Sequence, residues 1–68
     1  MSSRHDVTKS VPRRDVLPGT IVKHKGHAWR ASANTKSGLY LATAVEKTRI
    51  NVDYVEIYLN PFGNPLGI

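Results

Sequence analysis

Two histidines flank the one glycine in the stretch VKHKGHAWRA, residues 22–31, and neutral imidazoles are common metal ligands. If the chain turns at Gly26, His24 and His27 come close together across the turn. Two ligands do not hold a metal ion, and the chain has no cysteine and no carboxylate nearby in sequence to complete a set. The sequence therefore predicts two solvated histidines, no metal site and no other cofactor.

No pattern of acid–base or covalent catalysis is present either. None of the serines lies in a known nucleophile motif. Asp53 and Glu56 fall on opposite faces of the strand expected there, so they do not form a carboxylate pair. We therefore expect a protein that is not an enzyme, has no catalytic residues and takes no small-molecule substrate.

The same stretch combines positive charge with aromatic rings, the two features that single-stranded nucleic acids bind. Residues 20–36 contain four cations and no acid, within a chain of net charge +5. The candidate nucleic-acid-binding residues are Lys23, Lys25, Arg30, Lys36 and Tyr40. The same charge would also attract an acidic protein surface, so nucleic acid is the alternative to a protein partner.

The length of 68 residues allows one domain with a thin core. Without cysteines the chain has no disulfide to compensate, so a partner is expected, either subunits of a larger assembly or a second copy. No apolar run approaches the roughly 20 residues that span a bilayer, and the N-terminal residues lack the apolar centre of a secretory signal. We expect a soluble protein that is not exported by a signal peptide.

The elements that position these residues are predicted to be strands. Residues 20–33 read as two strands around a three-residue loop, 24–26, with Gly26 in the left-handed region and Trp29 anchoring the core. Residues 39–47 favour a strand over a short helix. Residues 50–59 form the last strand, with a bulge or a sharp coil near Asp53 and Tyr54 where the apolar alternation changes phase.

These strands predict an all-β fold, either a small SH3-like half-open barrel or a curled four-stranded antiparallel sheet. The module spans residues 16–60. A basic extended arm precedes it over residues 1–15, and a proline- and glycine-rich apolar arm follows over residues 61–68. The sequence thus predicts one small β-module with two arms.

The hairpin has a pattern of spaced residues beyond its strand alternation. Its members are Gly19, Val22, Gly26, Trp29, Ala31 and Thr35. This pattern resembles the first hairpin of chitin-binding-type carbohydrate modules and of related small modules in bacteriophage head and tail proteins. Ser32, Ala33 and Asn34 stand where the sugar-binding members have exposed aromatics, so the resemblance implies a scaffold rather than a sugar-binding site.

The resemblance implies a structural protein of a bacteriophage virion, such as a capsid decoration or cement protein or a head-tail accessory. Such a protein would be found in the virion or the host cytoplasm. It would dock on neighbouring subunits through its two arms, the basic one in an acidic groove and the apolar one in apolar holes. The candidate partner-binding residues are Arg4, Arg13, Arg14, Phe62, Leu66 and Ile68.

Overall fold

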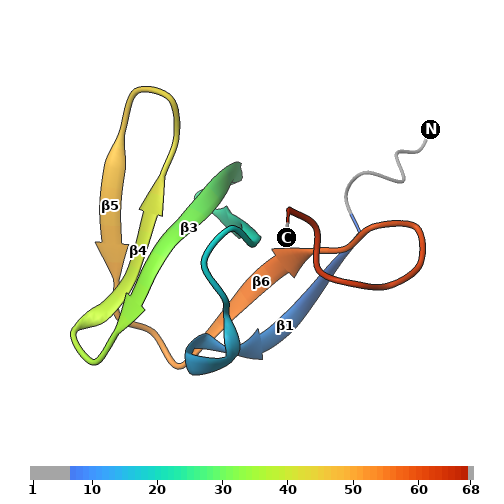
Figure 1. Ribbon diagram of the computed structural model, residues 1–68, viewed down its shortest axis with the longest axis horizontal. Helices are drawn as coiled ribbons and strands as arrows, with labels where there is room; N and C mark the ends of the chain where they lie inside the picture. The colour runs from blue at the N-terminus through green and yellow to red at the C-terminus, as the bar shows by residue number, and fades with distance from the viewer. Residues whose placement is uncertain (1–6, 68) are drawn as a thin grey trace.

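Six strands form one antiparallel sheet in the computed structural model, which describes residues 7–67. In chain order the elements are β1 (Thr8–Pro12), η2 (Arg13–Asp15, one turn of 3-10 helix), β2 (Ile21–His24), β3 (His27–Thr35), β4 (Gly38–Ala42), β5 (Lys47–Ile50) and β6 (Tyr54–Tyr58). The strands lie side by side in the order β1-β6-β2-β3-β4-β5, with β1 and β5 at opposite ends of the curled sheet (Figure 1). None of the described elements is a helix long and apolar enough to cross a membrane.

This arrangement confirms the all-β, half-open SH3-like fold that the sequence predicts, with six strands instead of four. The first additional strand, β1, lies inside residues 1–15, which the sequence places in an arm outside the module. It pairs along β6 from Thr8, opposite Tyr58, to Pro12, opposite Tyr54. Most of its side chains are polar, so backbone pairing and the single contact of Val11 with the core hold it in place. The sheet therefore begins before residue 16.

The second additional strand is β5, which the sequence merges with its predecessor into one strand over residues 39–47. The strand prediction holds as far as Ala42, where β4 ends. The Thr43 hydroxyl then accepts hydrogen bonds from the backbone N–H groups two and three residues later, at 3.3 and 3.0 Å. A hydroxyl used in this way stabilises a turn, so the chain reverses and β5 starts at Lys47.

The prediction of a three-residue loop between β2 and β3 is wrong, because the hairpin is tighter. Only Lys25 and Gly26 connect the strands, with φ values of 53° and 76°. Two positive φ values define a type I′ turn, whose twist matches that of the strands. The left-handed conformation costs Lys25 about 1 kcal/mol, but this register sets Val22 opposite Trp29, and both are buried.

A bulge at Ser32 shifts the register between β3 and β4. An extra residue in a strand reverses which of the following side chains face inward. Asn34 is therefore on the inner side of the sheet, opposite the buried Leu39. Of the bulge or sharp coil predicted near Asp53 and Tyr54, the structure has the coil, because residues 51–53 form an irregular link between β5 and β6.

A small core lies on the inner side of the sheet. Its buried apolar side chains are Val16, Val22, Trp29, Ala31, Leu39, Leu41, Val55 and Ile57. Trp29 is 5% exposed, which confirms its predicted role as the anchor of the core. Its indole N–H donates a hydrogen bond of 2.8 Å to the carbonyl of His24, so the ring is buried without leaving its one polar group unpaired.

The C-terminal segment folds back on the sheet as far as the structure describes it. The Leu66 N–H donates to the carbonyl of Tyr58 at 2.9 Å, and the Leu66 carbonyl accepts from the N–H of Ile21 at 3.0 Å. Leu66 thereby bridges the end of β6 and the start of β2. The apolar segment expected to reach a neighbour is hydrogen-bonded within its own chain at this position.

Candidate functional site

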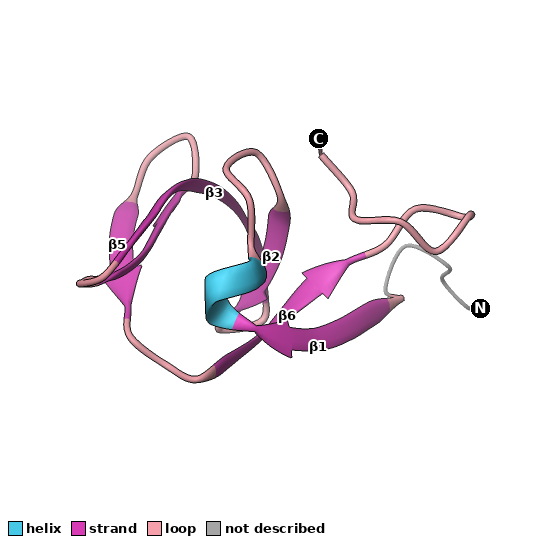
Figure 2. Ribbon diagram, turned by 60° about the horizontal axis from the view of Figure 1, so that its bottom comes forward, coloured by secondary structure: helices cyan, strands magenta, loops and turns pink. Residues whose placement is uncertain are grey.

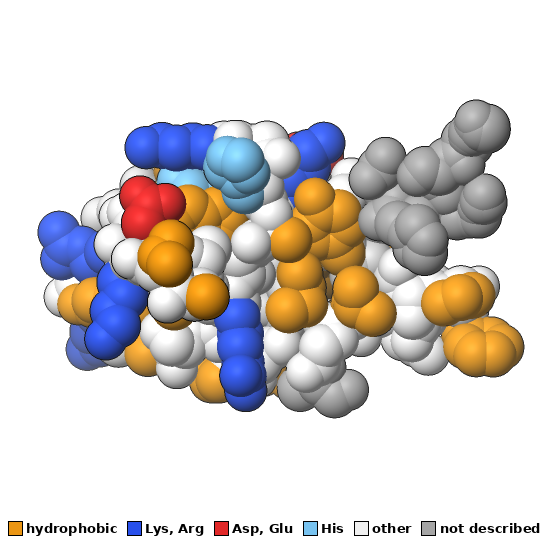
Figure 3. Space-filling model, turned by 90° about the horizontal axis from the view of Figure 1, so that it is seen from above, with side chains coloured by type: hydrophobic (Ala, Val, Ile, Leu, Met, Phe, Trp, Pro, Cys, Tyr) orange, Lys and Arg blue, Asp and Glu red, His pale blue; other side chains and the backbone are white. Residues whose placement is uncertain are grey.

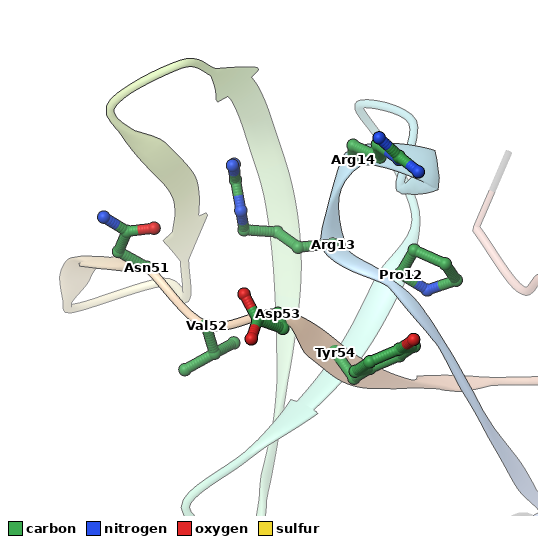
Figure 4. Close-up of a pocket in the computed structure, with 7 residues that line it drawn as sticks. All are labelled: Pro12, Arg13, Arg14, Asn51, Val52, Asp53 and Tyr54. Atoms are coloured by element: carbon green, nitrogen blue, oxygen red, sulfur yellow. The ribbon is translucent and has the colours of Figure 1, made fainter.

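A groove follows the junction of β1 and η2 and faces the link between β5 and β6 (Figure 4). Its volume is about 350 Å³, and its lining residues are Pro12, Arg13, Arg14, Asn51, Val52, Asp53 and Tyr54. A backbone hydrogen bond of 2.9 Å from the Arg13 N–H to the Asp53 carbonyl joins the two walls. The groove is therefore built on paired backbone.

Local sequence explains why the chain bends here. Pro12 ends β1 with φ −59° and ψ 138°, and it has no N–H to extend the strand ladder. Val16 directly follows η2 and is 3% exposed, so its burial draws the 3-10 turn against the core. In Figure 2 the turn lies between β1 and β6 on one side and β3 and β5 on the other.

The guanidinium of Arg13 fixes this turn to β3. Its Nη1 donates hydrogen bonds to Asn34 Oδ1 at 2.8 Å and to the carbonyl of Thr35 at 3.0 Å. The Asn34 Nδ2 donates in return to the carbonyls of Arg13, at 2.7 Å, and Val16, at 2.9 Å. Arg13 is therefore engaged within its own chain, and it shapes the groove from behind.

Apolar surface is uncovered on the same groove. Tyr54 is 64% exposed and Val52 is 44% exposed. Pro12 is the cross-strand neighbour of Tyr54, and the two lie next to each other in Figure 4. Arg14 and Asp53, both exposed, add one charge of each sign. Aromatic rings and arginines are the residues that contribute most to binding at protein interfaces.

A second hollow lies along η2 and the segment that follows it. Its volume is about 580 Å³, and it is lined by Arg13, Arg14, Val16, Leu17, Pro18, Asn34, Thr35 and Lys36. Leu17 is 59% exposed there. Because Arg13 and Arg14 line both hollows, η2 forms a ridge with uncovered apolar surface on each side.

The groove lining holds no histidine, serine or cysteine, and its one carboxylate is Asp53. Within residues 7–67 no three histidine, cysteine or acidic side chains are grouped so that they could hold a metal ion. His24 and His27 do face each other across the hairpin, and the His24 ring packs edge-on against Trp29 with 5.7 Å between centroids. The side chains that line the groove can make apolar contacts and hydrogen bonds with a bound protein segment.

The arginines predicted to bind a partner have separate roles. Arg14 is exposed at the groove. Arg13 lines the groove as well, but its guanidinium is bonded to β3. Arg4 lies outside the described residues. Of the three, Arg14 alone is both described and exposed, and the prediction for it stays open.

Of the apolar residues predicted for the C-terminal arm, Phe62 and Leu66 do not line the groove. The Asn60 side-chain oxygen accepts hydrogen bonds from the N–H groups of Phe62, at 2.9 Å, and Asn64, at 3.0 Å, which closes a loop. Phe62 is on this loop and is 86% exposed, whereas Leu66 is 41% exposed. Ile68 lies outside the described residues.

The residues predicted to bind nucleic acid are spread over the molecule. Arg30 and Tyr40 are exposed on the outer face of β3 and β4. Lys25 is in the β2–β3 turn, and Lys36 is in the β3–β4 turn beside the second hollow. Lys23 is exposed on β2, between Ala28 of β3 and Glu56 of β6. The structure therefore places Lys23, Arg30 and Tyr40 on the outer face of the sheet, whereas Lys25 and Lys36 lie in turns at opposite ends of β3.

Sequence reasoning missed Val52 and Tyr54 as surface residues. It assigned both to one face of the strand expected over residues 50–59, whereas Val52 lies in the link and Tyr54 begins β6. A signal was present, because Asn51 and Asp53 flank Val52 and both residue types favour turns. Two turn formers that alternate with an aliphatic residue indicate a break in the strand.

A family model described as the KilR SH3-type barrel domain matches residues 8–58, three quarters of the chain. The match runs from the first residue of β1 to the last residue of β6, so it includes the groove. No curated protein and no solved structure matches the chain. The resemblance of residues 19–38 to chitin-binding-type and phage modules is therefore wrong as a sign of kinship, since a turn glycine and a buried aromatic suit any tight hairpin. The chain belongs to the KilR SH3-type barrel domain family.

Proposed function

We propose that this protein is a non-catalytic binding module that holds a segment of another protein in the groove between η2 and the β5–β6 link. One observation carries the proposal: Tyr54, an aromatic residue that is 64% exposed, sits beside Pro12 on a frame that the Arg13–Asn34 hydrogen bonds hold rigid. Because the backbone around this ring is already fixed by hydrogen bonds, a partner binds there without first ordering a flexible segment.

The chemistry of the groove suits a peptide better than a polyanion. Tyr54 and Val52 offer apolar contact, and Asn51 offers an amide that can pair with a peptide backbone. Arg14 can bind a carboxylate of the partner. Asp53, on the same lining, would repel phosphate groups.

The predicted virion role and the predicted nucleic-acid role are not part of this proposal. The virion role depended on the hairpin resemblance, which the family match overturns. The nucleic-acid role depended on five residues acting as one surface, and two of them, Lys25 and Lys36, lie in turns at opposite ends of β3. Nucleic acid remains a possible outcome of the experiment described next.

The proposal can be tested by site-specific photo-crosslinking in cells that express the protein. Tyr54 is replaced by a photoreactive phenylalanine analogue in one variant, and Phe62 is replaced in the matched control. Both side chains are exposed aromatics, and Phe62 is the more exposed at 86%. We expect one discrete protein adduct from position 54 and none from position 62.

A purified partner then allows a quantitative test. Tyr54→Ala should weaken binding by about tenfold or more, as expected of an interface anchor, and Phe62→Ala should leave binding unchanged. Adducts to nucleic acid from position 54, or protein adducts from position 62 alone, would contradict the proposed groove.

A further inference from the structure

The strand β5 has a free edge. It pairs with β4 through Leu39 opposite Ile50, Leu41 opposite Thr48 and two further positions, and it is the last strand in the sheet order. In Figure 1 it stands at the end of the molecule away from β1. No other described strand pairs with its second side.

The hydrogen-bonding pattern between β4 and β5 shows which N–H and C=O groups of β5 are not bonded to β4. The Thr43 N–H donates to the Glu46 carbonyl at 2.8 Å, so this pair is a hydrogen-bonded one. Hydrogen-bonded and non-bonded pairs alternate in an antiparallel ladder. Lys47 and Arg49 therefore occupy non-bonded positions, and their N–H and C=O groups point away from β4.

Cations line this edge on the outer face of the sheet. Lys47 is in one row with Ala42 and Arg30, and Arg49 is opposite Tyr40 in the next row. All the cations in these rows are exposed. Figure 3 shows Lys and Arg side chains outnumbering acidic ones at the end of the molecule where β5 lies. The inner face of the same strand carries Thr48 and Ile50, both half-buried, with Ile50 packed against the core.

We propose that the free edge of β5 accepts an extended acidic segment of a partner protein as a seventh strand. The inference rests on the proposed function as a protein-binding module, and it adds a second surface and the chemistry of its ligand. Main-chain hydrogen bonds to Lys47 and Arg49 supply affinity, as in other cases of strand addition. The segment carries Asp or Glu on its outer face beside the two cations and apolar residues on its inner face beside Ile50.

A second copy of this chain is a poor occupant. Pairing two β5 strands would bring Lys47 and Arg49 of one copy against the same cations of the other, and like charges on adjacent strands destabilise pairing. The same charges that exclude self-association select an acidic strand. The positive charge of β5 therefore favours an acidic partner segment over a second copy of the chain.

The other free edge, on β1, is less suited to strand addition. The Arg13 N–H donates to Asp53, and the Leu59 N–H donates to Val7. By alternation, the backbone of Pro12 then points to the free side. Proline offers no N–H there. The residues that do offer an outward N–H, Thr8 and Ser10, carry no charge, so this edge would not select an acidic segment.

A short fluorescent peptide of alternating glutamate and valine tests the proposal on the full chain. Its controls are a peptide of the same composition with the glutamates grouped together, and one with lysine in place of glutamate. We expect saturable binding of the alternating acidic peptide, at least tenfold tighter than either control. Hydrogen exchange of the Lys47 and Arg49 amides should slow at least tenfold on binding, and exchange at Ser10 on β1 should not change.

Variants separate backbone pairing from charge. Arg49→Ala removes one charge, whereas Arg49→Pro also removes an outward N–H without breaking a bond to β4, so the proline variant should bind at least tenfold more weakly than the alanine variant. Lys47→Glu combined with Arg49→Glu should reverse the preference toward the lysine peptide. Nuclear magnetic resonance spectra confirm that each variant is folded.

Equal binding by the alanine and proline variants, or no protection of the two amides, would overturn strand addition. Binding of short oligothymidylate at this edge without binding of the acidic peptide would overturn it in favour of nucleic acid. Tyr54→Ala should leave peptide binding at β5 intact. If the acidic peptide does not bind at β5 but position 54 gives a discrete crosslink, only the strand-addition proposal is wrong. If the peptide does not bind and position 54 gives no crosslink, the proposed function is wrong as well.

Discussion

Arg13 and Asn34 bind each other in both directions: the guanidinium donates to the amide oxygen at 2.8 Å, and the amide nitrogen donates to the Arg13 carbonyl at 2.7 Å. A guanidinium can only donate and a carbonyl can only accept, so this geometry permits one orientation of the Asn34 amide. The pair joins two segments 21 positions apart in sequence. It determines where η2 lies, and hence the shape of the groove.

The neighbouring arginines should therefore differ in their effect on stability. Arg13→Gln removes two hydrogen bonds and should lower the free energy of unfolding by about 1–2 kcal/mol. Arg14→Gln changes an exposed side chain and should stay within about 0.5 kcal/mol of the parent protein. Urea denaturation of the two variants measures the difference. Equal effects would mean that the Arg13–Asn34 pair does not hold the turn.

The β2–β3 turn can be improved by one substitution. Lys25 has a φ of 53°, which asparagine tolerates better than lysine. Lys25→Asn should raise the free energy of unfolding by about 0.5–1 kcal/mol. Gly26→Ala should lower it by about 1 kcal/mol through backbone strain alone, because a Cβ there would meet no atom within 4 Å. Thermal denaturation tests both, and a destabilising Lys25→Asn would argue against a type I′ turn.

Gly38 should be far less tolerant than Gly26. Its φ is 148°, and a Cβ would lie 2.6 Å from the backbone oxygen of Ile50. The neighbour is backbone, so Gly38→Ala must push β5 away from β4, and we expect a loss of more than about 2 kcal/mol. Amide exchange at Thr48 should accelerate together with global unfolding. A mild effect, similar to that of Gly26→Ala, would show that the β4–β5 pair is loose.

Two side chains of the C-terminal loop should differ in their contribution to stability, because Asn60 accepts hydrogen bonds within the loop and Phe62 is exposed. Asn60→Ala removes the acceptor of two backbone N–H groups and should lower the free energy of unfolding by about 1 kcal/mol. Phe62→Ala alters a side chain that is 86% exposed and should change stability by less than about 0.5 kcal/mol. Chemical denaturation of both variants is the measurement. Strong destabilisation by Phe62→Ala would mean that the ring packs on the protein in solution.

Sequence reasoning succeeded where apolar residues alternate. Trp29 and its strand were predicted correctly because burial on one face produces a visible period of two. It failed at β1, whose residues are mostly polar and whose position depends on pairing with β6, far away in the chain. Non-local backbone pairing leaves no local pattern to read.

The candidate site was the less predictable part. Arg13 was expected to reach a partner, but its guanidinium is bonded to Asn34, and the inward direction of Asn34 depends on the bulge at Ser32. A bulge changes the face of every later residue in its strand without an obvious sequence signal. Lys47 and Arg49 were overlooked because the turn before β5 was read as continuous strand.

The most direct test of the account is the crosslink from position 54. We predict one protein adduct that forms from this position, disappears when unmodified protein is added in excess as a competitor, and does not form from position 62. Adducts of equal yield from both positions, or none from position 54 in any growth condition, would contradict the assignment of this groove as a protein-binding site.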